Sequence, residues 1–148
     1  MPRAGDIREF RLEDGGVALS LLNLGCITRG WWVPLGGALV PVVLGFDDPA
    51  DYLQNPTYMG VIAGRVANRI AGAGFVLDGK QHRLTANEGA NQLHGGAGGL
   101  HSRIWQAETE GARAVRFTYV SPDGEEGYPG RASFEVTVRL SGARVTYD

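Results

Sequence analysis

Apolar and polar residues alternate along several short segments of the chain, and this period of two predicts β-strands. The clearest segment is 133–140, whose apolar and polar side chains would lie on opposite faces of a strand. The apolar set is Phe134, Val136, Val138 and Leu140, and the polar set is Glu135, Thr137 and Arg139. Further strands are expected at 17–21 (half-buried), 27–33 (ended by Pro34), 75–77, 80–84, 115–120 and 144–148.

Turn signals separate these segments and favour an all-β fold. Asp78-Gly79 joins two of the expected strands by two residues, which is the spacing of a tight hairpin. Pro41 interrupts the apolar run 39–46 and argues against a central strand there. One short helix is expected at 49–53, with Asp48 as its cap. Because no long helix is expected, the pattern predicts a β-sandwich of many short strands.

Composition narrows the possible classes of protein. With 148 residues, of which 43% are hydrophobic and 20% charged, the chain suits one globular domain. A net charge of −2 argues against a nucleic-acid partner, which would need a basic surface. No apolar run approaches the roughly 20 residues that span a bilayer, and residues 1–6 lack an apolar signal segment. Cys26 is the only cysteine, so we expect no internal disulfide and a cytoplasmic location.

Candidate chemistry gathers between residues 64 and 105. Asn68 and Arg69 offer several donors and one acceptor, which suits sugar hydroxyls, although a structural ion pair or a capped turn is an equally open interpretation. His94 precedes two glycines, a loop in which a ligand can approach the backbone. His82 is expected to be structural, and His101 is ambiguous. Neither His94 nor His101 has a cysteine partner or the spacing of a zinc site, so no metal or cofactor is expected.

Several of these segments, in order, resemble the aldose 1-epimerase (galactose mutarotase) family. The segments are 58–70, 75–80, Asn87, 91–96, Gly99, Trp105 and 121–130. The resemblance implies a β-sandwich of the galactose-mutarotase type, a supersandwich, with the sugar in an open cleft. It also implies that Asn68 and Arg69 hydrogen-bond the sugar and that His94 contacts it near the reacting end, as an assisting group. The implied partner is a small sugar, an aldohexose.

The chain departs from the family pattern in one respect. The family's proton-donating histidine belongs to an Asn-His-x-Tyr-Phe-Asn segment, which this chain lacks, and its general base is a glutamate of the C-terminal half. Segment 144–148 reads as a strand that has just begun. We therefore expect residues 1–148 to be the N-terminal portion of a single domain, with the missing C-terminal half as its partner and without activity on its own.

Two other functions remain open at this stage. The chain could be a non-catalytic carbohydrate-binding module formed by this half alone. It could also belong to an epimerase-like protein that acts on a hexose 6-phosphate, with Arg65 and Arg69 gripping the phosphate. Glu125 and Glu126 match a loop motif of the family and are not candidates for the catalytic base.

Overall fold

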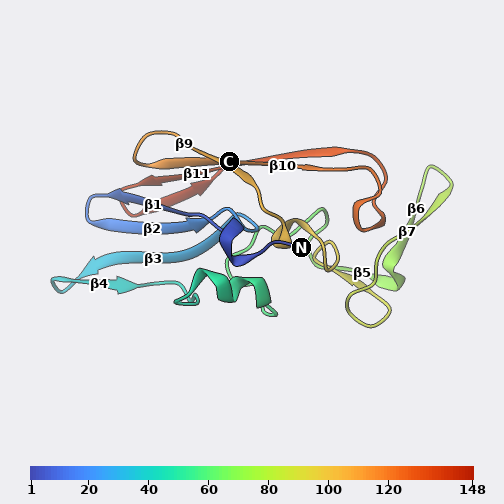
Figure 1. Cartoon of the computed structure of the whole chain (residues 1–148), viewed down its shortest axis with the longest axis horizontal. Coiled ribbons are helices and arrows are strands. Elements are labelled where there is room, and N and C mark those ends of the chain that lie inside the picture. Colours follow the sequence, from blue (N-terminus) through green and yellow to red (C-terminus); the bar gives the residue numbers. More distant parts are fainter.

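Two four-stranded antiparallel sheets form the body of the molecule in the computed structural model, which describes residues 1–148 (Figure 1). The first sheet has the order β1-β2-β3-β4, and the second has the order β12-β11-β10-β9. The strands of the first sheet are β1 (Glu9–Asp14), β2 (Val17–Leu22), β3 (Ile27–Leu35) and β4 (Ala38–Pro41). Those of the second are β9 (Gln106–Thr109), β10 (Ala114–Ser121), β11 (Ala132–Ser141) and β12 (Arg144–Tyr147).

The main hydrophobic core lies between these two sheets. Leu12, Val17, Leu19 and Leu21 come from the first sheet, and Val115, Phe117, Val138 and Leu140 from the second. All eight side chains are buried, and Trp105 joins them from the segment before β9. The expected β-sandwich is therefore confirmed.

Shorter elements extend from one end of the sandwich. Strand β5 (Arg69–Ile70) pairs with β8 (Gln92–Leu93), and β6 (Gly74–Leu77) pairs with β7 (Lys80–Arg83) as a hairpin that projects from the body (Figure 1). Five single-turn or short 3-10 helices complete the chain: η1 (Ala4–Asp6), η2 (Pro49–Gln54), η3 (Ala71–Ala73), η4 (Leu100–Ser102) and η5 (Glu125–Gly127). None of the helices is long and apolar enough to cross a membrane.

Most of the locally specified elements lie where the sequence placed them. The hairpin turns at Asp78-Gly79, with Leu77 paired to Lys80. The Asp48 carboxylate accepts a hydrogen bond from the Ala50 N–H at 2.8 Å and caps η2. Strand β4 ends at Pro41 and is an edge strand, so no central strand runs through 39–46. The expected strand at 144–148 is β12, which pairs with β11.

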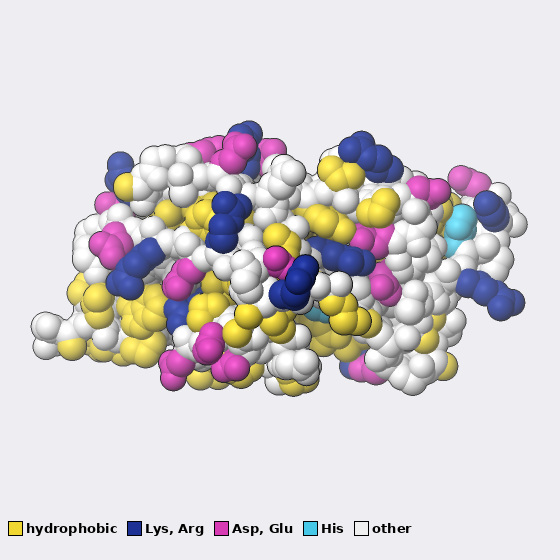
Figure 2. Space-filling view, in the orientation of Figure 1, with side chains coloured by type: hydrophobic (Ala, Val, Ile, Leu, Met, Phe, Trp, Pro, Cys, Tyr) yellow, Lys and Arg dark blue, Asp and Glu magenta, His cyan; other side chains and the backbone are white.

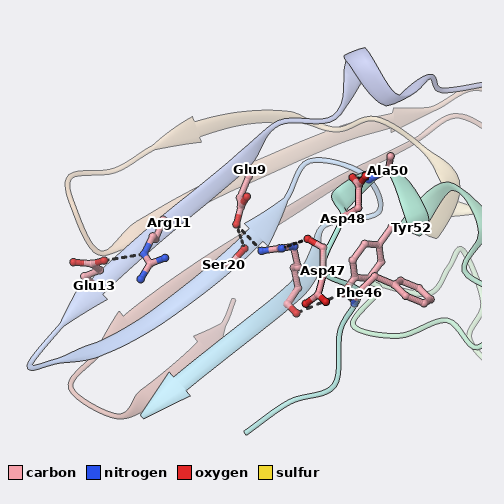
Figure 3. Close-up of polar contacts among 10 residues, drawn as sticks. Glu9, Arg11, Glu13, Ser20, Phe46, Asp47, Asp48, Ala50 and Tyr52 are labelled. Carbon is pink, nitrogen blue, oxygen red and sulfur yellow. Dashed lines mark hydrogen bonds and ion pairs between the residues drawn. The ribbon is translucent and has the colours of Figure 1, made fainter. Parts of the chain in front are cut away.

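Two expectations about the first sheet were wrong. Strand β2 is buried along its whole length instead of on one face, because its outer face is also covered. There, Ser20 donates to the Glu9 carboxylate at 2.5 Å (Figure 3), and Ala18 lies opposite Trp32 of the next strand. Pro34 does not end β3 but lies inside it. Pro34 pairs with Leu39 of β4. The last residue of β3 that pairs with β2 is Trp32, so at Pro34 only one side of β3 needs hydrogen bonds.

Candidate functional site

Asn68 and His94 meet where β5 begins and β8 ends. Arg69 of β5 pairs with Leu93 of β8, so the residue before one strand lies beside the residue after the other. The backbone N–H of Asn68 donates to Nδ1 of His94 at 3.0 Å, and the backbone N–H of His94 donates to the Asn68 carbonyl at 3.0 Å. Both residues have positive φ, 66° for Asn68 and 51° for His94. The two contacts hold these uncommon backbone conformations in place.

The contact at Nδ1 determines which nitrogen of His94 carries hydrogen. A backbone N–H can only donate, so Nδ1 must accept and cannot itself be protonated in this arrangement. The neutral imidazole then carries its hydrogen on Nε2. Nε2 makes no hydrogen bond within the protein and is not buried, so it is left to donate one to a bound molecule.

Arg69 shares this exposed edge and is oriented by a carboxylate that the sequence analysis did not single out. Its Nε and Nη2 donate to the two oxygens of Glu88, both at 2.6 Å, and its Nη1 donates to Oδ1 of Asn68 at 3.3 Å. The hydrogen bonds from Arg69 hold the pKa of the Glu88 carboxyl below its ordinary value. The ion pair expected as one interpretation therefore exists, and it places Arg69 and Asn68 side by side. The sequence around Glu88 did not indicate this contact, because Arg69 lies 19 residues away along the chain.

Tyr58 lies beside His94 and also beside His101. The ring centroids are 4.7 Å apart for Tyr58 and His94 and 4.9 Å apart for Tyr58 and His101, both in edge-to-face geometry. Tyr58 and His101 line an open cleft of about 440 Å³ together with Asn87. Burial lowers the pKa of His101 below its usual value, and the charge of Arg103 acts in the same direction. His101 is thus held neutral at the edge of the cleft, whereas His82 stacks on Phe75 in the hairpin.

Arg65, in contrast, does not face a ligand. All five of its N–H groups are used by the loop 121–130. Nε donates to the Ser121 hydroxyl at 2.9 Å, while Nη1 and Nη2 each donate to two backbone carbonyls at 2.7–3.2 Å. No donor remains for a phosphate, so the suggestion that Arg65 grips one was wrong.

Glu125 is likewise engaged inside the protein. It accepts hydrogen bonds from the Tyr119 and Ser121 hydroxyls and forms an ion pair with Arg103 at 2.9 Å. Burial raises the pKa of Tyr119 to about 12, and the hydrogen bond to Glu125 adds to the shift. A largely buried carboxylate that binds three donors inside the protein is poorly placed to take a proton from a substrate, which agrees with its exclusion as the catalytic base.

Comparison with known proteins connects this geometry to a family. The sequence pattern of the aldose 1-epimerases matches residues 8–148. The chain belongs to this family. It is 41% identical over 143 residues to galactose mutarotase of Bos taurus, which covers 96% of this chain and 42% of that protein. It is 34% identical over 143 residues to aldose 1-epimerase of Escherichia coli (strain K12), covering 93% of this chain and 41% of that protein.

Solved structures of the family share the fold. The chain is similar to an aldose epimerase homologue from C. elegans, with a TM-score of 0.85 and 31% identity, over 90% of this chain and 42% of that one. It is also similar to galactose 1-epimerase from Lactobacillus acidophilus, with a TM-score of 0.76 and 27% identity, over 92% of this chain and 41% of that one. The galactose-mutarotase type of sandwich is thus confirmed, and the chain spans less than half the length of the relatives that it matches.

Proposed function

We propose that this chain supplies the N-terminal portion of an aldose 1-epimerase, an isomerase that interconverts the α and β anomers of free aldohexoses such as galactose or glucose. The observation that carries the proposal is the exposed junction of β5 and β8, where Asn68, Arg69 and His94 hold one another in place. The names of the curated relatives support the same reaction. Residues 1–148 would then be one portion of a single domain that a C-terminal half completes.

The three residues would bind and orient the sugar. His94 would donate its Nε2 hydrogen to a sugar oxygen near the reacting end, and Asn68 and Arg69 would bind neighbouring hydroxyls through their remaining polar groups. Ring opening also needs one group that protonates the ring oxygen and one that removes the anomeric proton. The family resemblance assigns these two steps to a histidine and a glutamate in segments that this chain does not contain. We therefore expect the chain alone to bind sugar weakly and to catalyse little or nothing.

Polarimetry tests this proposal directly. Freshly dissolved α-glucose should change its rotation at the buffer rate with the chain alone. The rate should rise when the chain is combined with, or fused to, the C-terminal part of a relative such as the bovine galactose mutarotase. Because one positioned acid or base contributes roughly 10²–10⁴-fold, the difference should be large. No acceleration by a folded fusion would reject the proposal.

A non-catalytic sugar-binding module is the second candidate, since all three proposed sugar contacts lie within this chain. Saturable binding of galactose to the chain, together with an inactive fusion, would favour that candidate. The alternative of a protein that acts on a hexose 6-phosphate is weakened, because Arg65, one of the two arginines expected to bind the phosphate, has no free donor. The cytoplasmic location expected from the lone cysteine stays a prediction.

A further inference from the structure

The loop that carries His94 is held between two other parts of the backbone. On one side, Gly95 lies so close to Gly64 that a Cβ added to Gly95 would be 1.8 Å from the Gly64 carbonyl oxygen. On the other side, Cβ atoms added to Gly96 and Gly98 would lie 2.2 and 2.3 Å from the two carboxylate oxygens of Glu126. Only glycine fits at position 95, where the neighbour is backbone, whereas a side chain at position 96 or 98 would have to displace the Glu126 carboxylate.

Glu126 makes a specific contact with this loop as well as a steric one. Its Oε1 accepts a hydrogen bond from the Gly98 N–H at 2.9 Å, and its Oε2 is buried without a partner. Its own backbone has a φ of 51° and is fixed by the carbonyl, which accepts from Thr85 N–H at 3.0 Å and from the Gln92 side chain at 3.3 Å. Gln92 belongs to β8, two residues before His94. Glu126 therefore contacts the chain on both sides of His94.

The Arg65 side chain connects the two parts of the chain between which the His94 loop lies. Arg65 follows Gly64, which lies on one side of that loop, and its guanidinium binds the loop 121–130, which carries Glu126 on the other side. The centroid of the Tyr128 ring in the same loop lies 5.7 Å from the guanidinium carbon. The loop 95–98 thus lies between Gly64 and Glu126, and the Arg65 side chain connects these two sides. We call this arrangement of Gly64, Arg65 and Glu126 the clamp.

We propose that Glu126 is a positioning residue whose carboxylate acts through the Gly98 N–H to hold the His94 imidazole against the Asn68 N–H. It does not touch the sugar. Its role is to keep Nδ1 of His94 in the accepting position, so that Nε2 points outward with its hydrogen. The consequence for turnover rests on the proposed function, but the link between Glu126 and the His94–Asn68 contact does not.

The structural link is tested by hydrogen exchange of the Asn68 amide and by the nitrogen resonances of His94. These are measured on the chain, or on its complex with the C-terminal part of a relative if the chain alone gives no dispersed spectrum. In Glu126→Ala the Asn68 amide should exchange about fivefold faster or more, the factor expected for one lost hydrogen bond. The Nδ1 resonance should shift from that of an unprotonated acceptor towards the average of the two tautomers.

Two further variants separate positioning from general damage to the loop. Glu126→Gln keeps an oxygen that can accept from Gly98, so it should retain the native exchange rate and tautomer. Asp123→Ala removes a carboxylate of the same loop that binds only Gly130, so it should leave His94 unchanged. The proposal is overturned if Glu126→Ala leaves the Asn68 amide protected, if Glu126→Gln behaves like the alanine variant, or if Asp123→Ala has an equal effect.

Turnover of the active fusion gives an independent readout. Misplacement of His94 should lower kcat of Glu126→Ala by about tenfold to a hundredfold, with a smaller change in KM and with recovery in Glu126→Gln. An inactive parent fusion with the native His94–Asn68 contact would reject the proposed function and leave the positioning role intact. An active fusion in which Glu126→Ala changes neither readout would reject the positioning role alone.

Discussion

The Asn68 and His94 backbones are joined by a reciprocal pair of contacts, one through a carbonyl and one through the imidazole Nδ1. The pair resembles one step of a β-ladder in which a side chain replaces a backbone acceptor. It continues the pairing of β5 with β8 by one residue and, in doing so, directs a histidine nitrogen outward. The same contact therefore joins the two strands and determines which imidazole nitrogen is left to donate.

His94→Asn separates these two roles. An asparagine Oδ1 can occupy the place of Nδ1 and accept from Asn68, and asparagine tolerates the positive φ of this position. The variant should fold normally in an active fusion but lack the Nε2 donor, with a loss of turnover of about 10²–10³-fold. His82→Asn, in the projecting hairpin, is the control and should be nearly silent in polarimetry. Equal effects of the two changes would show that His94 has no special place in the site.

Local signals predicted those parts of the fold that depend on few residues. Asp78-Gly79 is sufficient for a hairpin, and the alternation along β11 follows directly from which side chains meet the core. The outer burial of β2 could not be predicted in this way. It depends on Glu9 from one neighbouring strand and Trp32 from the other, and the alternation of a single segment carries no information about such neighbours.

The residues of the candidate site were likewise predicted only in part. Asn68, Arg69 and His94, singled out by their residue chemistry and by the family resemblance, lie together, and their role in binding sugar stays a prediction. The residues that orient them were missed, because the contact from Glu88 to Arg69 spans 19 residues and that from Glu126 to Gly98 spans 28. Glycines at 95, 96 and 98 were the available signal. They indicated a close approach but not which residues approach.

Arg65 should be more important for stability than its position near the surface suggests. Arg65→Lys retains the charge but cannot supply five donors in a planar arrangement, so several carbonyls of the loop 121–130, most of them exposed, lose their protein partner. The free energy of unfolding should fall by about 1–2 kcal/mol. Arg131→Lys, at an exposed position in the neighbouring segment, should change it by less than about 0.5 kcal/mol. Denaturant titration measures both, and a silent Arg65→Lys would contradict the clamp.

Gly98 and Glu126 should be energetically coupled. Gly98 has an ordinary backbone conformation, so an alanine there is opposed by its neighbours alone, namely the Glu126 carboxylate and the Arg103 guanidinium. Gly98→Ala should destabilise the protein by about 1–3 kcal/mol, and about 0.5 kcal/mol or more of this should disappear in a Glu126→Ala background. Gly5→Ala, with open space around it, is the neutral control. Strict additivity of the two substitutions would place Glu126 away from the loop.

His101 should make the protein sensitive to mild acid. Its pKa in the folded state is lowered from the ordinary value of 6.5, chiefly by burial. Below that ordinary value the unfolded chain binds more protons than the folded one, so stability falls as the pH drops from about 6.5 through the lowered pKa. His101→Gln should flatten this dependence, measured as the urea midpoint between about pH 7.5 and about pH 5. An unchanged slope in His101→Gln would assign the acid sensitivity to other groups.

An exposed apolar strip along β3, β4 and the segment after them should control how the chain behaves in concentrated solution. Leu35, Leu39, Val42 and Leu44 are 67%, 50%, 51% and 85% exposed, and apolar side chains gather over this part of the surface (Figure 2). Soluble monomers seldom expose a large contiguous apolar patch, and β4 is also an edge strand with free hydrogen-bonding groups. The chain alone should therefore bind a hydrophobic dye and self-associate as its concentration rises.

Leu39→Lys with Leu44→Lys should reduce dye binding and self-association without lowering the melting temperature, because neither side chain belongs to a buried core cluster. Val76→Lys with Leu77→Lys is the matched control, since it removes two exposed apolar side chains from the projecting hairpin instead. Light scattering and dye fluorescence should respond to the first pair far more than to the second. If both pairs act equally, overall hydrophobicity determines the association, and the strip is not a specific contact surface.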